Sequence, residues 1–141
     1  LEVDFFVDSF GGFTNSILKD FTTGFTEIHF NKNQFVNTKG IEKIKVLTET
    51  VDNYCKENNF EPDFIKIDAE GAEINILKGS LETIKHVKCM MIEASRDKKE
   101  IYEILDKNFN LYSSHFKKIK SVNDMNHNIF CLSKKYYTKE L

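Results

Sequence analysis

The chain has 141 residues, of which 40% are apolar and 30% charged, with a formal net charge of −2. A chain of this size buries about two-thirds of its unfolded surface, and this composition differs from that of disordered or disulfide-rich secreted proteins. Because acidic and basic residues are interspersed, we expect no single-sign surface for a nucleic acid or an anionic membrane. We therefore predict one folded domain over residues 1–141 that binds neither.

Cysteine and histidine usage predicts an intracellular chain without a metal site. The cysteines Cys55, Cys89 and Cys131 are odd in number and widely spaced, as is typical of reduced core thiols. The four histidines show no metal-ligand spacing. No stretch approaches the roughly 18 apolar residues of a membrane span, and no signal peptide is recognised. A cytoplasmic location is the default expectation.

Strand and helix patterns alternate along the first two-thirds of the chain. Short apolar or alternating runs predict strands at residues 3–7, 41–47, 63–68 and 89–94. Residues with helical spacing follow polar or glycine start signals at Thr48, Gly71, Ser80 and Asp97. The last helix is expected to open with a capping box of Asp97 and Glu100 and to extend to Phe109.

The last third changes character. Residues 110–116 and 128–133 are strand candidates joined by a polar loop, which predicts a hairpin. Strands that alternate with helices and end in such a hairpin indicate an α/β fold. We expect a mostly parallel sheet with helices on both faces and a C-terminal antiparallel hairpin.

The residues with chemical potential lie where the predicted strands end. Ligands of open α/β sheets bind beyond the carboxyl ends of the strands, and Asp68 and Glu93 are predicted there. Lys66 lies inside an apolar run, where an unpaired buried charge would cost several kcal/mol. It either pairs with Asp68, which points to the same side of the strand, or extends to solvent.

The turn after the strand at residues 63–68 is a second feature. Gly71 has no Cβ, so the backbone or a ligand can approach closely at that point. Asp68 and Glu70, two residues apart, can bind a cation, hold a hydroxyl group or act as a base. Glu73 lies in the first helical turn, where a carboxylate interacts favourably with the helix dipole.

These residues belong to a segment with a specific resemblance. The run D-F-I-K-I-D-A-E-G-A-E-I-N-I-L-K-G-S, from Asp63 to Ser80, closely resembles the "D-x-I-K-I-D-x-E-G-x-E-x-x-x-L-x-G" stretch of the FkbM-type methyltransferases. Thr50-Val51-Asp52 is similar to the family's "T-L-D" helix start, and Met91-Ile92-Glu93 resembles its next strand. The resemblance covers about residues 1–94.

The resemblance implies a Rossmann-like class I methyltransferase sheet and an S-adenosylmethionine-dependent O-methyltransferase. The methyl acceptor would be a hydroxyl group of a sugar, a glycan or another small metabolite. Asp68 and Glu70 would be catalytic, and Asp68 and Gly71 would lie beside the cofactor. Three residues would support them or contact the substrate: Lys66, Glu73 and Glu93.

One family feature has no counterpart in this chain. Family members begin with a strand and a glycine-rich loop of the type "D-x-G-A-N-x-G", whereas the only glycine pair here is Gly11-Gly12. We therefore expect the chain to be the C-terminal portion of a methyltransferase domain, completed by an upstream domain or by another copy in a homo-oligomer. Two alternatives stay open: a non-catalytic binding or interaction module, and a carboxylate-metal site formed by Asp68, Glu70 and Glu93.

Overall fold

The computed structural model describes residues 1–7, 15–20 and 41–138, which form two compact units. Unit 1 comprises Leu1–Thr48 with Glu70–Ala72, and unit 2 comprises Glu49–Ala69 with Glu73–Leu141. The glycine pair Gly11-Gly12 lies outside the described residues. None of the described helices is long and apolar enough to cross a membrane.

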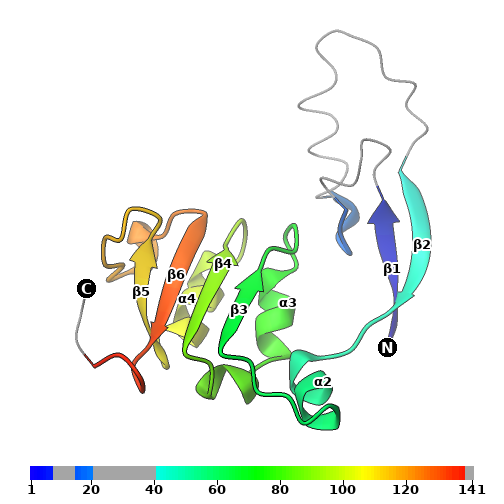
Figure 1. Ribbon diagram of the computed structural model, residues 1–141. Coiled ribbons are helices and arrows are strands. Elements are labelled where there is room, and N and C mark those ends of the chain that lie inside the picture. The colour runs from blue at the N-terminus through cyan, green and yellow to red at the C-terminus, as the bar shows by residue number, and fades with distance from the viewer. Residues whose placement is uncertain (8–14, 21–40, 139–141) are drawn as a thin grey trace, which may run out of the picture. The chain divides into compact units, whose positions relative to one another are not determined.

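Unit 1 contains an antiparallel pair of strands, β1 (Glu2–Val7) and β2 (Glu42–Leu47) (Figure 1). Both strands were expected from the sequence. Asp4 of β1 lies opposite Lys45, and its carboxylate is 2.7 Å from the Lys45 ammonium and 3.3 Å from that of Lys43. Cross-strand pairs of opposite charge stabilise such a ladder on its polar side.

Unit 2 contains a four-stranded sheet (Figure 1). In spatial order its strands are β3 (Phe64–Ile67), β4 (Cys89–Glu93), β6 (Asn128–Ser133) and β5 (Phe109–Ser113). β4 runs parallel to β3, whereas β6 runs antiparallel to both β4 and β5. The predicted C-terminal hairpin is confirmed as β5 and β6.

The prediction of a mostly parallel sheet is wrong, because β6 lies between β4 and β5. The two strands of a hairpin must run antiparallel, and a returning strand that inserts into the sheet makes an antiparallel ladder on each edge. Within the described sheet, only the β3–β4 ladder is parallel. The apolar runs predicted the strands but carried no signal for this order.

The helix that follows unit 1 is α2 (Val51–Glu57), and its N-cap is Thr50 rather than the expected Thr48. The Thr50 hydroxyl accepts a hydrogen bond from the backbone N–H of Asn53 at 3.1 Å. The Thr48 hydroxyl instead donates to the backbone carbonyl of Leu1 at 2.9 Å. Thr48 is therefore engaged by the hairpin of unit 1 and does not cap α2.

Two further helices follow β3 and β4: α3 (Glu73–Lys78) and α4 (Lys98–Leu105). The helix expected after Ser80 is only a 3-10 turn, η1 (Thr83–Lys85). The expected capping box of α4 is wrong, since Asp97 has a left-handed backbone (φ 49°) and its side chain makes no cap hydrogen bond. Phe109, expected in this helix, begins β5.

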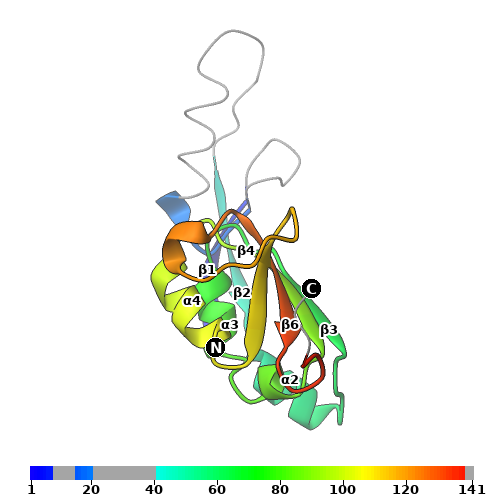
Figure 2. The same ribbon diagram turned by 90° about the vertical axis from the view of Figure 1, so that its left-hand side faces the viewer.

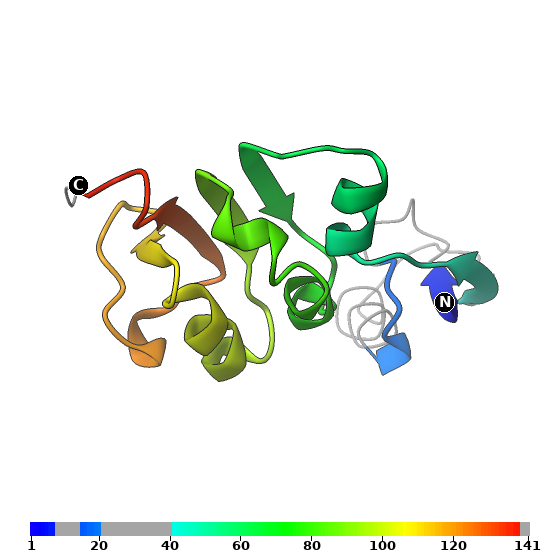
Figure 3. The same cartoon turned by 90° about the horizontal axis from the view of Figure 1, so that it is seen from below.

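Helices α3 and α4 lie side by side on one face of the sheet (Figures 2 and 3). Burial alternates along β4 and β6, and the inward positions form a core with both helices. In the described part of the chain no helix covers the other face, where Phe64 is 53% exposed. The expectation of helices on both faces is therefore wrong for these residues.

The core predicts the effect of one substitution in α3. Leu77→Ala should lower the free energy of unfolding by about 2–5 kcal/mol, because it leaves a cavity at a fully buried position. Urea denaturation followed by circular dichroism measures the change. Leu81→Ala, the same substitution at a 43% exposed position, is the control and should change stability much less. Equal losses in both variants would contradict the assigned core.

Candidate active site

Two acidic residues lie at the carboxyl ends of the parallel strands. Ile67 of β3 pairs with Ile92 of β4, so the next residues, Asp68 and Glu93, follow side by side. Their carboxyl groups share a hydrogen bond. The structure thus brings together the two strand-end acids that the sequence analysis singled out, at the edge where α/β sheets bind ligands.

Lys66 completes this group by pairing with Asp68. Its ammonium lies 2.9 Å from the Asp68 carboxylate, and its side chain is 54% exposed. Both outcomes considered for this residue therefore occur together: it is paired, and it reaches solvent. The hydrogen bond from Lys66 lowers the pKa of Asp68, and the same contact raises the pKa of Lys66. Asp68 is consequently held as a carboxylate.

The pKa of Glu93 is shifted in the opposite direction from that of Asp68. Burial raises its pKa, and the negative charge of Asp68 and the shared hydrogen bond raise it further, whereas the charge of His127 acts to lower it. Two adjacent carboxyl groups in different environments acquire different protonation behaviour. Asp68 accepts hydrogen bonds as a carboxylate, and Glu93 keeps its proton to a higher pH than an ordinary glutamate.

The turn after Asp68 has a left-handed backbone at two successive residues, Glu70 (φ 48°) and Gly71 (φ 93°). The second value strongly favours glycine, which explains why the turn needs Gly71. The backbone carbonyl of Glu70 accepts a hydrogen bond at 2.8 Å from Ser16, whose side chain is buried. Glu70 and Gly71 belong to unit 1, and their catalytic and cofactor-binding roles stay predictions.

Glu73 lies in the first turn of α3, as expected, but it is far more buried than a residue that only interacts with the helix dipole. Its carboxylate accepts hydrogen bonds from the backbone N–H of Ala69 at 3.2 Å and from the Ser95 hydroxyl at 3.4 Å. The sequence analysis missed Ser95. Its position two residues after Glu93, in the loop that follows β4, was the available signal.

The alternative of a carboxylate-metal site is not supported. Among residues 1–7, 15–20 and 41–138, no group of three His, Cys, Asp or Glu side chains could hold a metal ion. Asp68 instead has a cation in direct contact, the Lys66 ammonium, and shares a hydrogen bond with Glu93. The described contacts of these two carboxyl groups are thus with protein groups.

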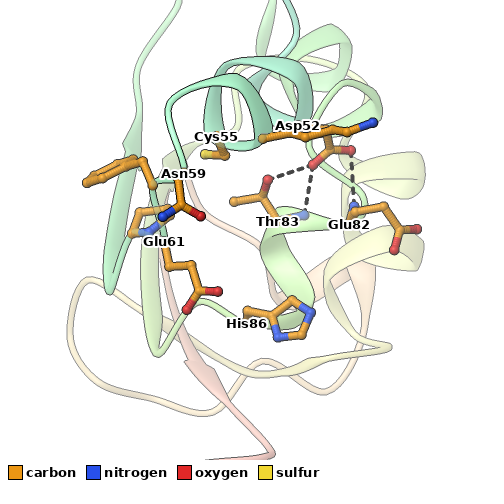
Figure 4. A pocket seen from close by; sticks show the side chains of 10 residues that line it. Asp52, Cys55, Asn59, Glu61, Glu82, Thr83 and His86 are labelled. Carbon is orange, nitrogen blue, oxygen red and sulfur yellow. Dashed lines mark hydrogen bonds between the residues drawn. The ribbon is translucent and has the colours of Figure 1, made fainter.

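A cavity of about 310 Å³ lies at the opposite end of the sheet (Figure 4). It is bounded by α2, by the loop that precedes β3 and by η1, which precedes β4. It therefore opens at the amino ends of these strands, away from Asp68 and Glu93. Ligands of open α/β sheets bind at the carboxyl ends of the strands, so this cavity lies away from the expected ligand-binding edge.

Asp52 occupies one wall of this cavity and anchors η1 (Figure 4). Its carboxylate accepts hydrogen bonds from the Thr83 hydroxyl at 2.6 Å and from the N–H groups of Thr83 at 2.8 Å and Glu82 at 3.1 Å. Burial acts to raise its pKa, but these hydrogen bonds outweigh burial and lower it. The Thr50-Val51-Asp52 segment thus has a structural explanation, because Thr50 caps α2 and Asp52 holds η1.

Comparison with known proteins identifies one family. A family model described as "Methyltransferase FkbM domain" matches residues 6–121. No curated protein and no solved structure matches the chain. The matched range includes β3, the turn after it and the strand end at Glu93.

The ion pair of Lys66 predicts how the titration of Asp68 responds to its loss. Lys66→Met should raise the pKa of Asp68, as measured by the side-chain carboxyl resonance in an NMR pH titration. Because the pKa of Asp68 is depressed below the unfolded value of 3.8, this contact contributes stability that is lost as pH falls through the folded pKa. The variant should therefore lose less stability in acid. Lys78→Met, which removes a pair with Glu100, is the control and should leave Asp68 unchanged.

The hydrogen bonds from η1 to the Asp52 carboxylate should stabilise the fold without affecting Asp68 and Glu93. Asp52→Ala should lower the free energy of unfolding by about 1–2 kcal/mol, since three hydrogen bonds to a charged acceptor are lost. The titrations of Asp68 and Glu93 should not change. Glu82→Ala, which removes only a surface pair with Lys85, should be nearly neutral in the same denaturation experiment.

Proposed function

Because the chain belongs to the FkbM methyltransferase family, we propose that it transfers a methyl group from S-adenosylmethionine to a hydroxyl oxygen. Methyltransferases of this family use S-adenosylmethionine. The acceptor that we propose is a sugar, a glycan or another small metabolite with a free hydroxyl group. The observation that carries the proposal is the Asp68–Glu93 carboxyl pair at the strand ends, inside the segment that matches the family.

The residues at the strand ends fit both the cofactor and a hydroxyl acceptor. A carboxylate suits hydroxyl donors and a positively charged sulfonium, and Asp68 is held in that form by Lys66. Gly71, whose φ is 93°, has no Cβ that would hinder close approach at the turn. When bound, S-adenosylmethionine supplies a methyl group that is already activated for transfer.

We assign Asp68 mainly to orientation of the acceptor. Its carboxylate would accept a hydrogen bond from the acceptor hydroxyl and would receive the proton as the new carbon–oxygen bond forms. Its pKa is lowered by Lys66, so it is a weak base, and alignment of the two reactants contributes more than proton abstraction. Glu93, which keeps its proton more readily, would donate to Asp68 and fix its orientation. Glu70 stays a second candidate catalytic acid.

The free edge of β3 supports a further part of the proposal. In the described residues β3 is the last strand of its sheet, and no other strand pairs with its second edge. An unpaired strand edge can pair with another strand. We propose that an upstream segment or a second copy of the chain supplies that strand, as expected from the sequence.

Cofactor binding is the first test of this function. Isothermal titration of the chain with S-adenosylmethionine should show saturable binding. Asp68→Asn should weaken that binding by at least about tenfold, because a charge-assisted interaction with the cofactor is lost. Folding should change little, as measured by circular dichroism.

The matched control is Asp63→Asn, the same substitution just before β3. The Asp63 side chain is 76% exposed and pairs with Lys88 on the surface, so this variant should bind the cofactor like the unchanged chain. Loss of binding in both variants would contradict the assignment of Asp68. Absence of binding both by this chain and by a version extended upstream would overturn the proposal and favour the non-catalytic binding module.

A further inference from the structure

Glu73 is an unusual residue for the start of a helix, because its side chain is only 1% exposed. A carboxylate removed from water loses several kcal/mol of solvation, and such residues persist where hydrogen bonds compensate the loss. A glutamate that served only the helix dipole would be equally effective at the surface. The burial of Glu73 therefore requires a second explanation.

The two oxygen atoms of Glu73 accept hydrogen bonds from different segments. One oxygen accepts from the N–H of Ala69, the residue directly after Asp68, at 3.2 Å. The other accepts from the hydroxyl of Ser95, two residues after Glu93, at 3.4 Å. One buried side chain thus connects the segments that leave β3 and β4, immediately beyond the two acids of the carboxyl pair.

We propose that Glu73 is a positioning residue, whose buried carboxylate holds the segments after β3 and β4 so that Asp68 and Glu93 stay side by side. The role of this pair in methyl transfer rests on the proposed function. The geometry of the connection does not, since it follows from the contacts of Ala69 and Ser95.

The electrostatics of the site agree with this role. Around Glu93 lie the carboxyl group of Asp68 at the end of β3, Glu73 of α3 and His127 before β6. Burial and Asp68 raise the pKa of Glu93 most, the negative charge of Glu73 adds to the same direction, and His127 opposes it. Lys66 acts on the site mainly through its bond to Asp68. The charge of Glu73 thus adds the smallest of these contributions, and its role in the placement of the pair rests on its two hydrogen bonds.

Two substitutions separate these contributions. Glu73→Gln keeps an oxygen that can accept from Ala69 and an amide that can bond to Ser95, but it removes the charge. Glu73→Leu has a similar volume and removes both the charge and the hydrogen bonds. Glu100→Gln is the control, since Glu100 is a half-exposed residue that pairs with Lys78.

The measurements are an NMR pH titration of the Glu93 and Asp68 carboxyl groups and a calorimetric titration with S-adenosylmethionine, both on the full 141-residue chain. In Glu73→Gln the pKa of Glu93 should fall and cofactor affinity should stay close to that of the unchanged chain. In Glu73→Leu the affinity should drop by about tenfold or more, because a displaced Asp68 carboxylate loses a charge-assisted hydrogen bond to the ligand. The control should match the unchanged chain in both measurements.

The outcomes distinguish this inference from the proposed function. In Glu73→Gln, which keeps both hydrogen bonds, a loss of cofactor affinity as large as that expected of Glu73→Leu would overturn the inference, even if Glu73→Leu failed to fold. Unchanged affinity in a folded Glu73→Leu variant would overturn it as well. If neither this chain nor a version extended upstream bound S-adenosylmethionine, the proposed function would fail. The connection through Glu73 would still be supported if Glu73→Leu changed the titration of Asp68 and Glu73→Gln did not.

Discussion

The candidate site depends on the parallel ladder between β3 and β4. Parallel strands end at the same edge of a sheet, and the pairing of Ile67 with Ile92 places Asp68 beside Glu93. Had the two strands been antiparallel, their terminal acids would lie at opposite edges. An antiparallel strand, β6, pairs with the other edge of β4. The ends of β3 and β4 nevertheless stay side by side, which is what a site at the strand ends requires.

Two adjacent carboxyl groups repel each other when both are ionised. In this chain the environments of Asp68 and Glu93 differ, so that the two groups need not be ionised together. Lys66, two residues before Asp68, stabilises one group as a carboxylate. Burial favours the protonated form of the other, Glu93. Different environments therefore divide the roles of acceptor and donor between neighbouring acids, which is how proteins obtain distinct chemistry from identical functional groups.

The polar residues at the two ends of the sheet differ in their contacts. At the amino ends of β3 and β4, Asp52 and Thr50 satisfy backbone N–H groups and hold local structure. At the carboxyl ends, Asp68 is ion-paired yet partly exposed and retains the capacity to accept further hydrogen bonds. The cavity and the Thr50-Val51-Asp52 segment thus mark structural anchors at one end, whereas the chemistry is expected at the other.

The sequence by itself determined the family segment, the positions of the strands and the placement of Asp68 and Glu93 at strand ends, because these depend on local periodicity and short motifs. It also singled out Gly71 as a residue without Cβ at the turn after the strand, whereas the left-handed backbone of that turn was seen only in the structure. Only the tertiary structure decided the position of β6, the burial of Glu73 and its contact with Ser95, which lies 22 residues away along the chain. Contacts of this kind arise when separate segments pack together, and no local pattern along the chain encodes them.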